Sequence, residues 1–311
     1  MLMALLMLVV GFALLIKGAD FFVDGASSVA KMLKVPSMII GLTIVAMGTS
    51  LPECAVSVTA SITGNNALAV SNVVGSNIFN LMVVCGCCAL FTPLAIQKDT
   101  LKKEYPFSII CALLLLAFGY MKMELGRIDG IIFLVIFAGY LLWMVKSALD
   151  ARTNASDEEE VETLPIWKCL LYIIGGGLAI KYGGDFVVDG AVVVAEAFGL
   201  TENLIGLTIV ALGTSLPELV TSIVAARKNE VDMALGNVIG SNIFNILLVL
   251  GVAATISPIA FIMENIIDTI LLIVMSCIVY LMVRKDLKIG RKEGIAMLLM
   301  YAAYLVYIII R

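Results

Sequence analysis

The sequence predicts an all-α membrane protein with ten transmembrane helices, arranged as two inverted five-helix repeats with broken helices at the centre. The chain is 61% hydrophobic and only 14% charged, it contains ten apolar stretches, and its two halves repeat each other. Soluble proteins average about 45–50% apolar and about 25% charged residues, so this composition excludes a soluble globule. A helix that crosses a bilayer needs about 20 largely apolar residues, and the 311 residues accommodate ten with short connections.

The repeat appears as near-identity at a fixed spacing along the chain. The segment GLTIVAMGTSLPE at residues 41–53 recurs as GLTIVALGTSLPE at 206–218. At the same spacing, NVVGSNIFN at 72–80 recurs as NVIGSNIFN at 237–245. One unit of roughly half the chain has therefore been duplicated.

Each copy contains five apolar stretches separated by short polar breaks. We expect helices at 2–30, 37–62, 66–91, 105–122 and 127–149, and at 166–195, 202–227, 231–256, 264–283 and 291–310. The first repeat is then 1–149, an acidic cytoplasmic linker is 150–165, and the second, inverted repeat is 166–311. The acidic run Asp157–Glu160 lacks the Gly turn and spaced ligands of a calcium loop, which favours a solvated linker over a regulatory cation sensor.

The distribution of basic residues gives an orientation. An odd number of helices per repeat makes the two copies enter the membrane in opposite directions. Most of the 20 basic residues then lie in connections on one face, which the positive-inside rule places in the cytoplasm. These residues are Lys31, Lys34, Lys98, Lys102, Lys103, Lys146, Arg152, Lys168, Arg227, Lys228, Arg284, Lys285, Lys288, Arg291 and Lys292. We therefore expect both termini outside the cell.

The second helix of each copy carries a carboxylate where hydrocarbon should surround it. Glu53 and Glu218 follow Gly-Thr-Ser-Leu-Pro near the middle of their apolar stretches. A carboxylate at that depth costs about 2.5–3.5 kcal/mol on insertion scales. Ionisable residues that a chain accepts inside the membrane are functional by default.

The proline of the same motif predicts a break in the helix. Pro52 and Pro217 have no N–H, so they free the carbonyls of Gly48 and Gly213 four residues earlier. Non-helical backbone at this depth is tolerated where it lines a cavity. The groups beside it are all oxygen donors, which is the ligand set for hard cations such as Ca²⁺ and Na⁺. The hydroxyls are those of Thr49, Ser50, Thr214 and Ser215.

The third helix of each copy adds further polar groups. Ser76 lies four residues before Asn80, and Ser241 lies four before Asn245, so each pair shares a helix face. Asn80 and Asn245, which end the two motifs, are at the depth of the glutamates, and this favours cation coordination. The other amides of the motif could equally join helices or line the site; they are Asn72, Asn77, Asn237 and Asn242. The glycines Gly75, Gly240 and Gly236 are expected to permit close helix packing.

Inverted repeats would bring Glu53 and Glu218 together at the bilayer midplane, where transporters of this construction bind their substrates. Two nearby carboxylates repel each other strongly in a low dielectric. One Ca²⁺ or several Na⁺ would cancel both charges, so the two occupancies exclude each other. This predicts antiport.

The paired motifs resemble the α-repeats of the sodium/calcium exchanger family in its prokaryotic form, over essentially the whole chain. The resemblance implies a secondary antiporter of the prokaryotic cytoplasmic membrane that exchanges several Na⁺ for one Ca²⁺ by alternating access, without a cofactor or nucleic acid. By its motif, Glu53 and Glu218 with Thr49 and Thr214 hold Ca²⁺. The Na⁺ sites use the same glutamates, Ser50, Ser76, Ser215, Ser241 and the backbone of Ala46 and Ala211, while Asn80 and Asn245 line the centre.

One departure from the family concerns Asn80 and Asn245. Some members, including the potassium-dependent branch, have Asp at one of these positions, whereas this chain has Asn at both. This leaves potassium dependence and the ion ratio open. The proton-coupled calcium branch usually has a different glutamate motif, so Na⁺ is favoured over H⁺ as the coupling ion.

Two other function classes are possible. A cation channel could be lined by the same oxygens, although the inverted duplication favours a transporter. An intramembrane hydrolase would need Ser50 or Ser215 as its nucleophile, but the chain has no His and no Lys near either serine to activate the hydroxyl. Four further acids could lie in a vestibule or in a helix interface, and we favour the interface: Asp20, Asp24, Asp185 and Asp189.

Overall fold

The computed structural model describes residues 1–63, 67–154, 163–199 and 211–310, and this part of the chain is almost entirely helical. The acidic run Asp157–Glu160 and the beginning of the predicted helix 202–227 lie outside these residues. The all-α membrane class is confirmed. The described exceptions are four strands of two residues each.

The first repeat begins with α1 (Leu2–Leu33). Its second helix is interrupted, and consists of α2 (Ser37–Ile40), the π-helix η1 (Gly41–Val45), α3 (Ala46–Thr49) and α4 (Leu51–Thr63). Its third consists of α5 (Ala67–Phe79), the π-helix η2 (Asn80–Val84) and α6 (Cys85–Phe91). The repeat ends with β1 (Leu94–Ala95), α7 (Lys98–Lys102), α8 (Glu104–Lys122), β2 (Glu124–Leu125) and α9 (Arg127–Asn154).

The second repeat follows the same order. It begins with α10 (Ile166–Ala197), α12 (Ala211–Gly213) and α13 (Leu216–Arg227). Its third helix consists of α14 (Val231–Phe244), the π-helix η4 (Asn245–Leu250) and α15 (Gly251–Ile256). It ends with β3 (Ile259–Ala260), α16 (Met263–Val283), β4 (Lys288–Ile289) and α17 (Arg291–Ile310). The predicted boundaries hold to within a few residues, except that α9 extends past 149 and a short α7 precedes α8.

Seven helical segments of the described chain are long and apolar enough to cross a membrane, and a bent pair, Ser37–Thr49 with Leu51–Ile62, makes eight. A further helix, α10, has 32 residues but carries Lys181, Asp185 and Asp189. In the segments Ala69–Phe91 and Val231–Ile256, 78% of the apolar window is buried, against 22–44% in the other five. The third helix of each repeat therefore forms the centre of the molecule, and the other five segments leave most of their apolar windows exposed.

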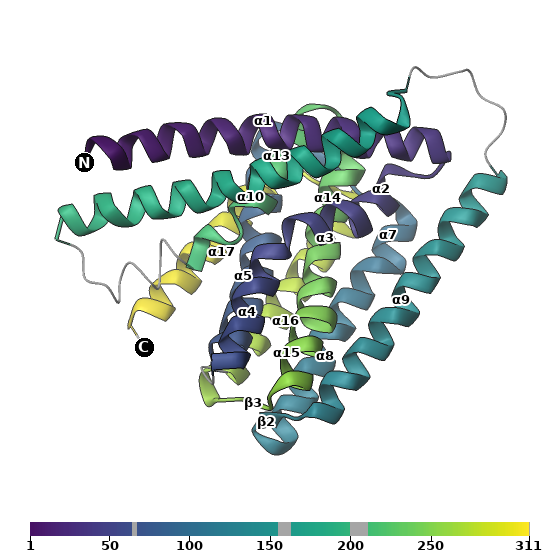
Figure 1. Cartoon of the computed structure of the whole chain (residues 1–311). Coiled ribbons are helices and arrows are strands. Elements are labelled where there is room, and N and C mark those ends of the chain that lie inside the picture. Colours follow the sequence, from purple (N-terminus) through teal and green to yellow (C-terminus); the bar gives the residue numbers. More distant parts are fainter. Residues whose placement is uncertain (64–66, 155–162, 200–210, 311) are drawn as a thin grey trace.

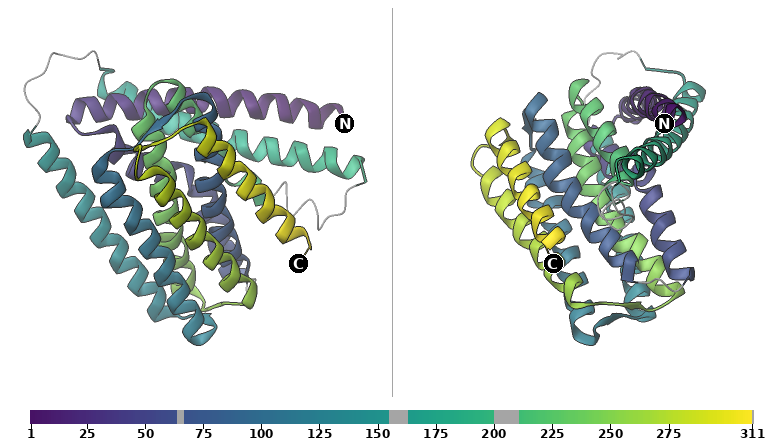
Figure 2. Two further views of the ribbon diagram at one scale, coloured as in Figure 1. Left: turned by 180° about the vertical axis from the view of Figure 1, so that it is seen from behind. Right: turned by 90° about the vertical axis from the view of Figure 1, so that its left-hand side faces the viewer.

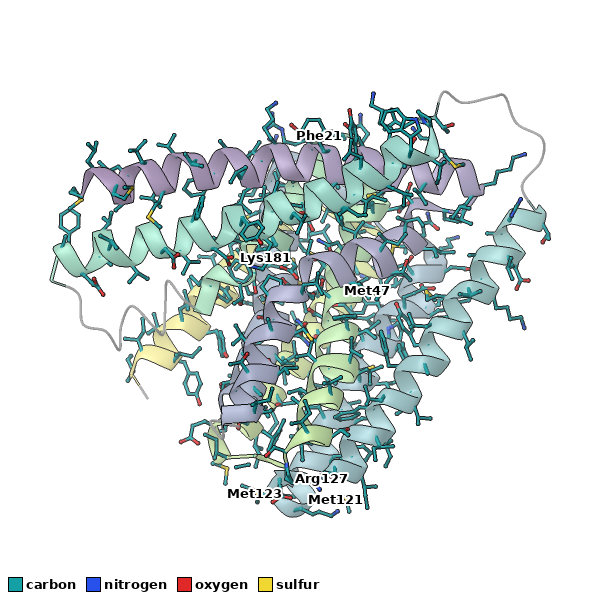
Figure 3. The ribbon with its side chains drawn as sticks, viewed as in Figure 1. Phe21, Met47, Met121, Met123, Arg127 and Lys181 are labelled. Atoms are coloured by element: carbon teal, nitrogen blue, oxygen red, sulfur yellow. The ribbon has the colours of Figure 1, made fainter. Side chains whose placement is uncertain are left out.

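The strand pairs show that the repeats are inverted. β1 of the first repeat pairs antiparallel with β4 of the second, and β2 pairs with β3. Each pair therefore joins the connection before the fourth helix of one repeat to the connection after the fourth helix of the other. A connection before the fourth helix of one repeat and a connection after the fourth helix of the other can lie together only when these two helices run in opposite directions. The two repeats are therefore inverted. Figure 1 shows β2 and β3 together at the lower end, and Figure 3 places Met121, Met123 and Arg127 there.

The long helices α1 and α10 run antiparallel beside each other, on one side of the bundle (Figures 1 and 2). Glycines at the crossing bring the backbones together, as in other membrane helix pairs. A Cβ on Gly11 would lie 2.8 Å from the carbonyl oxygen of Gly183, and one on Gly18 would lie 2.9 Å from that of Gly176. The sequence analysis did not identify this contact. It joins the first helices of the two repeats.

Candidate cation-binding site

The second helix of each repeat breaks immediately before Leu-Pro-Glu. Ser50 has φ −85° and ψ 9°, and Ser215 has φ −94° and ψ 4°, so both leave the helical conformation in the same way. The axis of the first of these helices bends by 49°. Each break places a glutamate in the first turn of the helix that follows, Glu53 in α4 and Glu218 in α13. The N–H groups and positive dipole end of a first turn favour a carboxylate there.

The two glutamates are joined through serines of the opposite repeat. The Ser50 hydroxyl donates to Oε1 of Glu218 at 2.8 Å, and the Ser215 hydroxyl donates to Oε1 of Glu53 at 3.1 Å. Neither glutamate is exposed to solvent. The structure thus brings these four residues from both repeats into one buried site.

The third helices complete the site. The Ser76 hydroxyl lies 3.4 Å from Oε1 of Glu53 and 3.1 Å from the Ser215 hydroxyl. Asn80 and Asn245 are completely buried and begin the π-helices η2 and η4. Short π-helical turns are frequent at functional sites. Sequence reasoning missed them, because a single chain gives no local signal for one extra residue in a helical turn.

Several buried polar atoms around the glutamates have no hydrogen-bond partner. A buried oxygen without a partner costs about 1–3 kcal/mol, and more when it is charged. In the described residues, the oxygens are Oε2 of Glu53, Oε2 of Glu218, Oδ1 of Asn80, Oδ1 of Asn242, Oδ1 of Asn245, Oγ1 of Thr214 and Oγ of Ser241, and Nδ2 of Asn80 also has no partner. Two carboxylate oxygens with neutral amide and hydroxyl oxygens form a donor set that suits hard cations. No group of three or more His, Cys, Asp or Glu side chains able to hold a metal occurs in the described chain.

The remaining predicted site residues lie around the breaks. The Thr49 hydroxyl donates to Oδ1 of Asn237 at 3.0 Å and lies within 3.4 Å of backbone carbonyls one turn earlier. Ala46 begins α3 and is fully buried, and its carbonyl accepts the Ser50 N–H at 3.1 Å. Ala211 begins α12, and its side chain lies outside the described part of the chain.

Four asparagines, for which the sequence left open whether they join helices or line the site, all join helices. Asn237 donates to the Ser222 hydroxyl of α13 at 2.9 Å, and Asn72 donates to that of Ser57 in α4 at 3.1 Å. Asn77 and Asn242 each donate to the other's backbone carbonyl at 3.1 Å. These bonds fix the third helices against the second helices and against each other.

Two glycines of α14 pack closely against the second helix of the other repeat. A Cβ on Gly240 would lie 2.7 Å from the carbonyl oxygen of Leu42, and one on Gly236 would lie 2.7 Å from that of Met38, so both permit close packing. The helix α14 accordingly packs directly on α2 and η1. The segment that would face Gly75 in the same way, 201–210, lies outside the described residues, so the expectation for Gly75 stays a prediction.

A pocket of about 340 Å³ reaches Thr214 of the candidate site. It is lined by residues of α4 and α10 and by the α12–α13 break, including Val56, Thr214 and Pro217. Asp185 and Asp189 also line it, so the expected interface role was wrong for these two acids. Lys181, which pairs with Asp185 at 2.8 Å, lies on α10 at the same pocket (Figure 3).

The pseudo-symmetric acids Asp20 and Asp24 contact the end of α13. Lys228, at the end of α13, donates to Asp24 Oδ1 at 2.7 Å and to the Asp20 carbonyl at 2.9 Å. Glu230 accepts hydrogen bonds from Ser27 and, at 2.8 Å, from Ser37. These contacts hold α1 against the connection from α13 to α14, so the interface role is correct for Asp20 and Asp24.

Comparisons with known proteins agree with this architecture. The family model "Sodium/calcium exchanger protein" matches residues 3–146 and 168–310. The putative antiporter CaxA of Alkalimonas amylolytica is 45% identical over 83% of this chain and 82% of its own. The sodium/calcium exchanger MaX1 of Methanosarcina acetivorans is 33% identical over 97% of both chains. A structure of the sodium-calcium exchanger NCX_Mj soaked with zero Na⁺ and Ca²⁺ is 33% identical, covers 99% of both chains and has a TM-score of 0.86.

Proposed function

The chain belongs to the sodium/calcium exchanger family, which comprises membrane transporters and not enzymes, and on this premise we propose that it exchanges Na⁺ for Ca²⁺ across the membrane by alternating access. One observation carries the proposal. Glu53 and Glu218 come from oppositely directed helices, share hydroxyl partners across the repeats, and are surrounded by buried oxygens without partners.

The residues have distinct roles in this proposal. Glu53 and Glu218 supply the two negative charges that Ca²⁺ cancels, with Thr49 and Thr214 as neutral ligands. Na⁺ ions use the same glutamates, so they compete with Ca²⁺ for charge and not only for space. The other proposed Na⁺ ligands are Ser50, Ser76, Ser215, Ser241 and the backbone of Ala46 and Ala211, and the amides of Asn80 and Asn245 line the centre.

Electrostatics couples the two ions. When the site is empty, two carboxylates repel each other inside protein of low dielectric, and moving this charged site between the two faces is unfavourable. Either loaded form is close to neutral and can change its side. The protein therefore crosses between the two open states with ions bound, which is the condition for exchange.

The proposed location is the prokaryotic cytoplasmic membrane, with both termini outside and the linker in the cytoplasm. In Figure 1 both termini lie toward the left, and the end of α9 and the start of α10 lie toward the upper right. Most basic residues of the connections lie on the side of the linker, as the positive-inside rule requires for a cytoplasmic face. With this orientation, the pocket opens to the outside of the cell.

Radiolabelled Ca²⁺ uptake into proteoliposomes tests the proposal, with Na⁺, K⁺ and pH gradients imposed one at a time. We expect an opposed Na⁺ gradient alone to drive uptake. Uptake driven by a pH gradient alone would make the protein a Ca²⁺/H⁺ antiporter, and unitary currents would make it a channel.

Neutral variants test the site itself. We expect Glu53→Gln and Glu218→Gln each to abolish Na⁺-driven Ca²⁺ uptake, because glutamine keeps the shape but removes one of the two charges. Glu104→Gln is the matched control, since Glu104 in α8 is a partly buried carboxylate whose Oε2 also has no partner but which lies outside the site. Uptake that persisted in either site variant would remove the proposed site.

A further inference from the structure

The two central helices are joined by a reciprocal pair of amides. Nδ2 of Asn77 in α5 donates to the carbonyl of Asn242 in α14, and Nδ2 of Asn242 donates to the carbonyl of Asn77, both at 3.1 Å. The two residues are 165 apart and occupy the same place in their repeats. As far as these two bonds are concerned, the centre of the protein is symmetric.

These bonds fix the orientation of a third amide. A carbonyl only accepts hydrogen bonds, so the atom of Asn77 that faces it must be nitrogen and the other must be Oδ1. That oxygen lies 3.1 Å from Asn245, which must therefore present its own Nδ2. The remaining atom of Asn245 is Oδ1, which is buried and has no partner. Asn77 thus turns the Asn245 oxygen away from itself and leaves it available to a cation.

The equivalent contact in the other repeat is not formed. Symmetry would have Nδ2 of Asn80 donate to Oδ1 of Asn242. In the structure, Oδ1 of Asn242 and both polar atoms of Asn80 have no hydrogen-bond partner, although both residues are buried. The donor and the acceptor of one symmetric bond are both present and both unused.

The two repeats differ in this amide bond, and they also differ in their access to the pocket. The pocket reaches Thr214 beside α4 and α10, while on the side of the symmetric acids Lys228 bonds to Asp24 and Glu230 accepts from Ser37. Inverted repeats exchange their conformations when a transporter opens to its other face. The bond from Asn245 to Asn77 belongs to the state described here, and a bond from Asn80 to Asn242 would complete the opposite state.

We propose, on the basis of the proposed function, that Asn77 is a positioning residue that aims the Asn245 oxygen at the bound cation, and that Asn242 positions Asn80 in the same way when the site opens to the opposite face. An unfixed amide can present either its oxygen or its N–H₂ to a cation, and only the oxygen is a ligand. Holding the oxygen in place beforehand removes the cost of ordering it on binding.

The chain supplies its own matched control. Asn77→Ala and Asn242→Ala each remove one amide-to-carbonyl bond of 3.1 Å, but only Asn77→Ala also releases Asn245 in the state described here. The experiment measures the half-saturating Ca²⁺ concentration for Na⁺-driven exchange at each face, in right-side-out and inside-out vesicles. Thermal unfolding of the purified, ion-free variants and equilibrium Ca²⁺ binding to them are measured alongside.

We expect both variants to lose similar thermal stability. At the face to which the pocket opens, Asn77→Ala should raise the half-saturating Ca²⁺ concentration about fivefold and Asn242→Ala less than twofold, because one hydrogen bond is worth about 1 kcal/mol and 1.4 kcal/mol is a factor of ten. At the other face the order should reverse. Equal effects of the two variants at both faces would mean that they only join helices, and would overturn the inference.

A second pair keeps the test decisive if an alanine variant does not fold. Asn77→Asp retains an oxygen that accepts the Asn245 amide, and Asn242→Asp adds the same charge at the symmetric position. We expect the two to bind Ca²⁺ equally well, and weaker binding by Asn77→Asp would overturn the inference. If the unmodified protein bound no Ca²⁺, the proposed function would fail and the inference with it. If the unmodified protein bound Ca²⁺, equal losses in the two alanine variants, or weaker binding by Asn77→Asp than by Asn242→Asp, would overturn the inference alone.

Discussion

Each glutamate of the site is oriented by a serine that belongs to the other repeat. Ser50 and Ser215 both lie at a helix break, where the hydroxyl is not directed along a continuous helix and can reach across the interface. Each serine satisfies Oε1 of one carboxylate and leaves Oε2 without a partner. The breaks therefore expose oxygens and also fix the direction in which they point.

Removal of one serine hydroxyl tests this orientation. We expect Ser50→Ala to raise the half-saturating Ca²⁺ concentration of exchange about tenfold, because a hydrogen bond to a charged group is worth about 1.5–3 kcal/mol and 1.4 kcal/mol is a factor of ten. The control is Ser276→Ala, since Ser276 is also buried but donates to the Leu272 carbonyl of its own helix at 2.7 Å. Equal effects of the two substitutions on Ca²⁺ would contradict the assigned role.

At the scale of elements, three kinds of helix irregularity build the site. The break before Pro52 or Pro217 exposes a first turn, the π-helices begin at Asn80 and Asn245, and glycines let central helices approach each other. A straight helix would satisfy its own backbone and keep these side chains apart. The break and the π-helix occur in both repeats, and the close glycine contacts are those of α14 with the second helix of the first repeat.

Two adjacent glycines of α10 give a matched test of the contact with α1. A Cβ at Gly176 would lie 2.7 Å from the Gly18 carbonyl oxygen, whereas one at Gly175 would meet nothing within 4 Å. We expect Gly176→Ala to lower the free energy of unfolding by about 1–3 kcal/mol, the usual range for overpacking, and Gly175→Ala to leave it unchanged or slightly raised, since alanine favours the helix. Thermal unfolding in detergent with and without Ca²⁺ measures both, and equal losses would show that the close contact is unimportant.

At the scale of the whole molecule, the two repeats have nearly the same sequence motifs but different surroundings. Val56 in α4 is 44% exposed and lines the pocket, while Thr221, at the same position of α13, is completely buried. Asp185 and Asp189 likewise line the pocket, whereas Asp20 and Asp24 contact Lys228. One sequence pattern thus adopts two conformations at once, as a transporter open to a single face requires.

Cysteine labelling measures this asymmetry directly. In a background without the seven native cysteines, we expect Val56→Cys to react with a membrane-impermeant maleimide from the side of the termini, at least tenfold faster than Thr221→Cys reacts from either side. Saturating Ca²⁺ should slow the Val56→Cys reaction if the pocket is the route to the site. Equal reaction rates at the two positions would show that the asymmetric state is not the one populated in the membrane.

The sequence by itself determined the membrane class, the duplicated repeat, the boundaries of the described helices to within a few residues and the polar residues that lie at the centre. It could do so because hydrocarbon imposes long apolar stretches, and because a carboxylate or a proline within such a stretch is costly enough to be conspicuous.

Only the tertiary structure decided which groups meet. Glu53 with Ser215, Glu218 with Ser50, and Asn77 with Asn245 are contacts between residues more than 160 positions apart, and their geometry depends on the inverted packing of two units. The tertiary structure also decided that symmetric sequences take asymmetric places, with Asp185 in the pocket and Asp24 bound to Lys228. A duplicated sequence specifies the same local preferences twice, and only the packing of one copy against the other can make their surroundings differ.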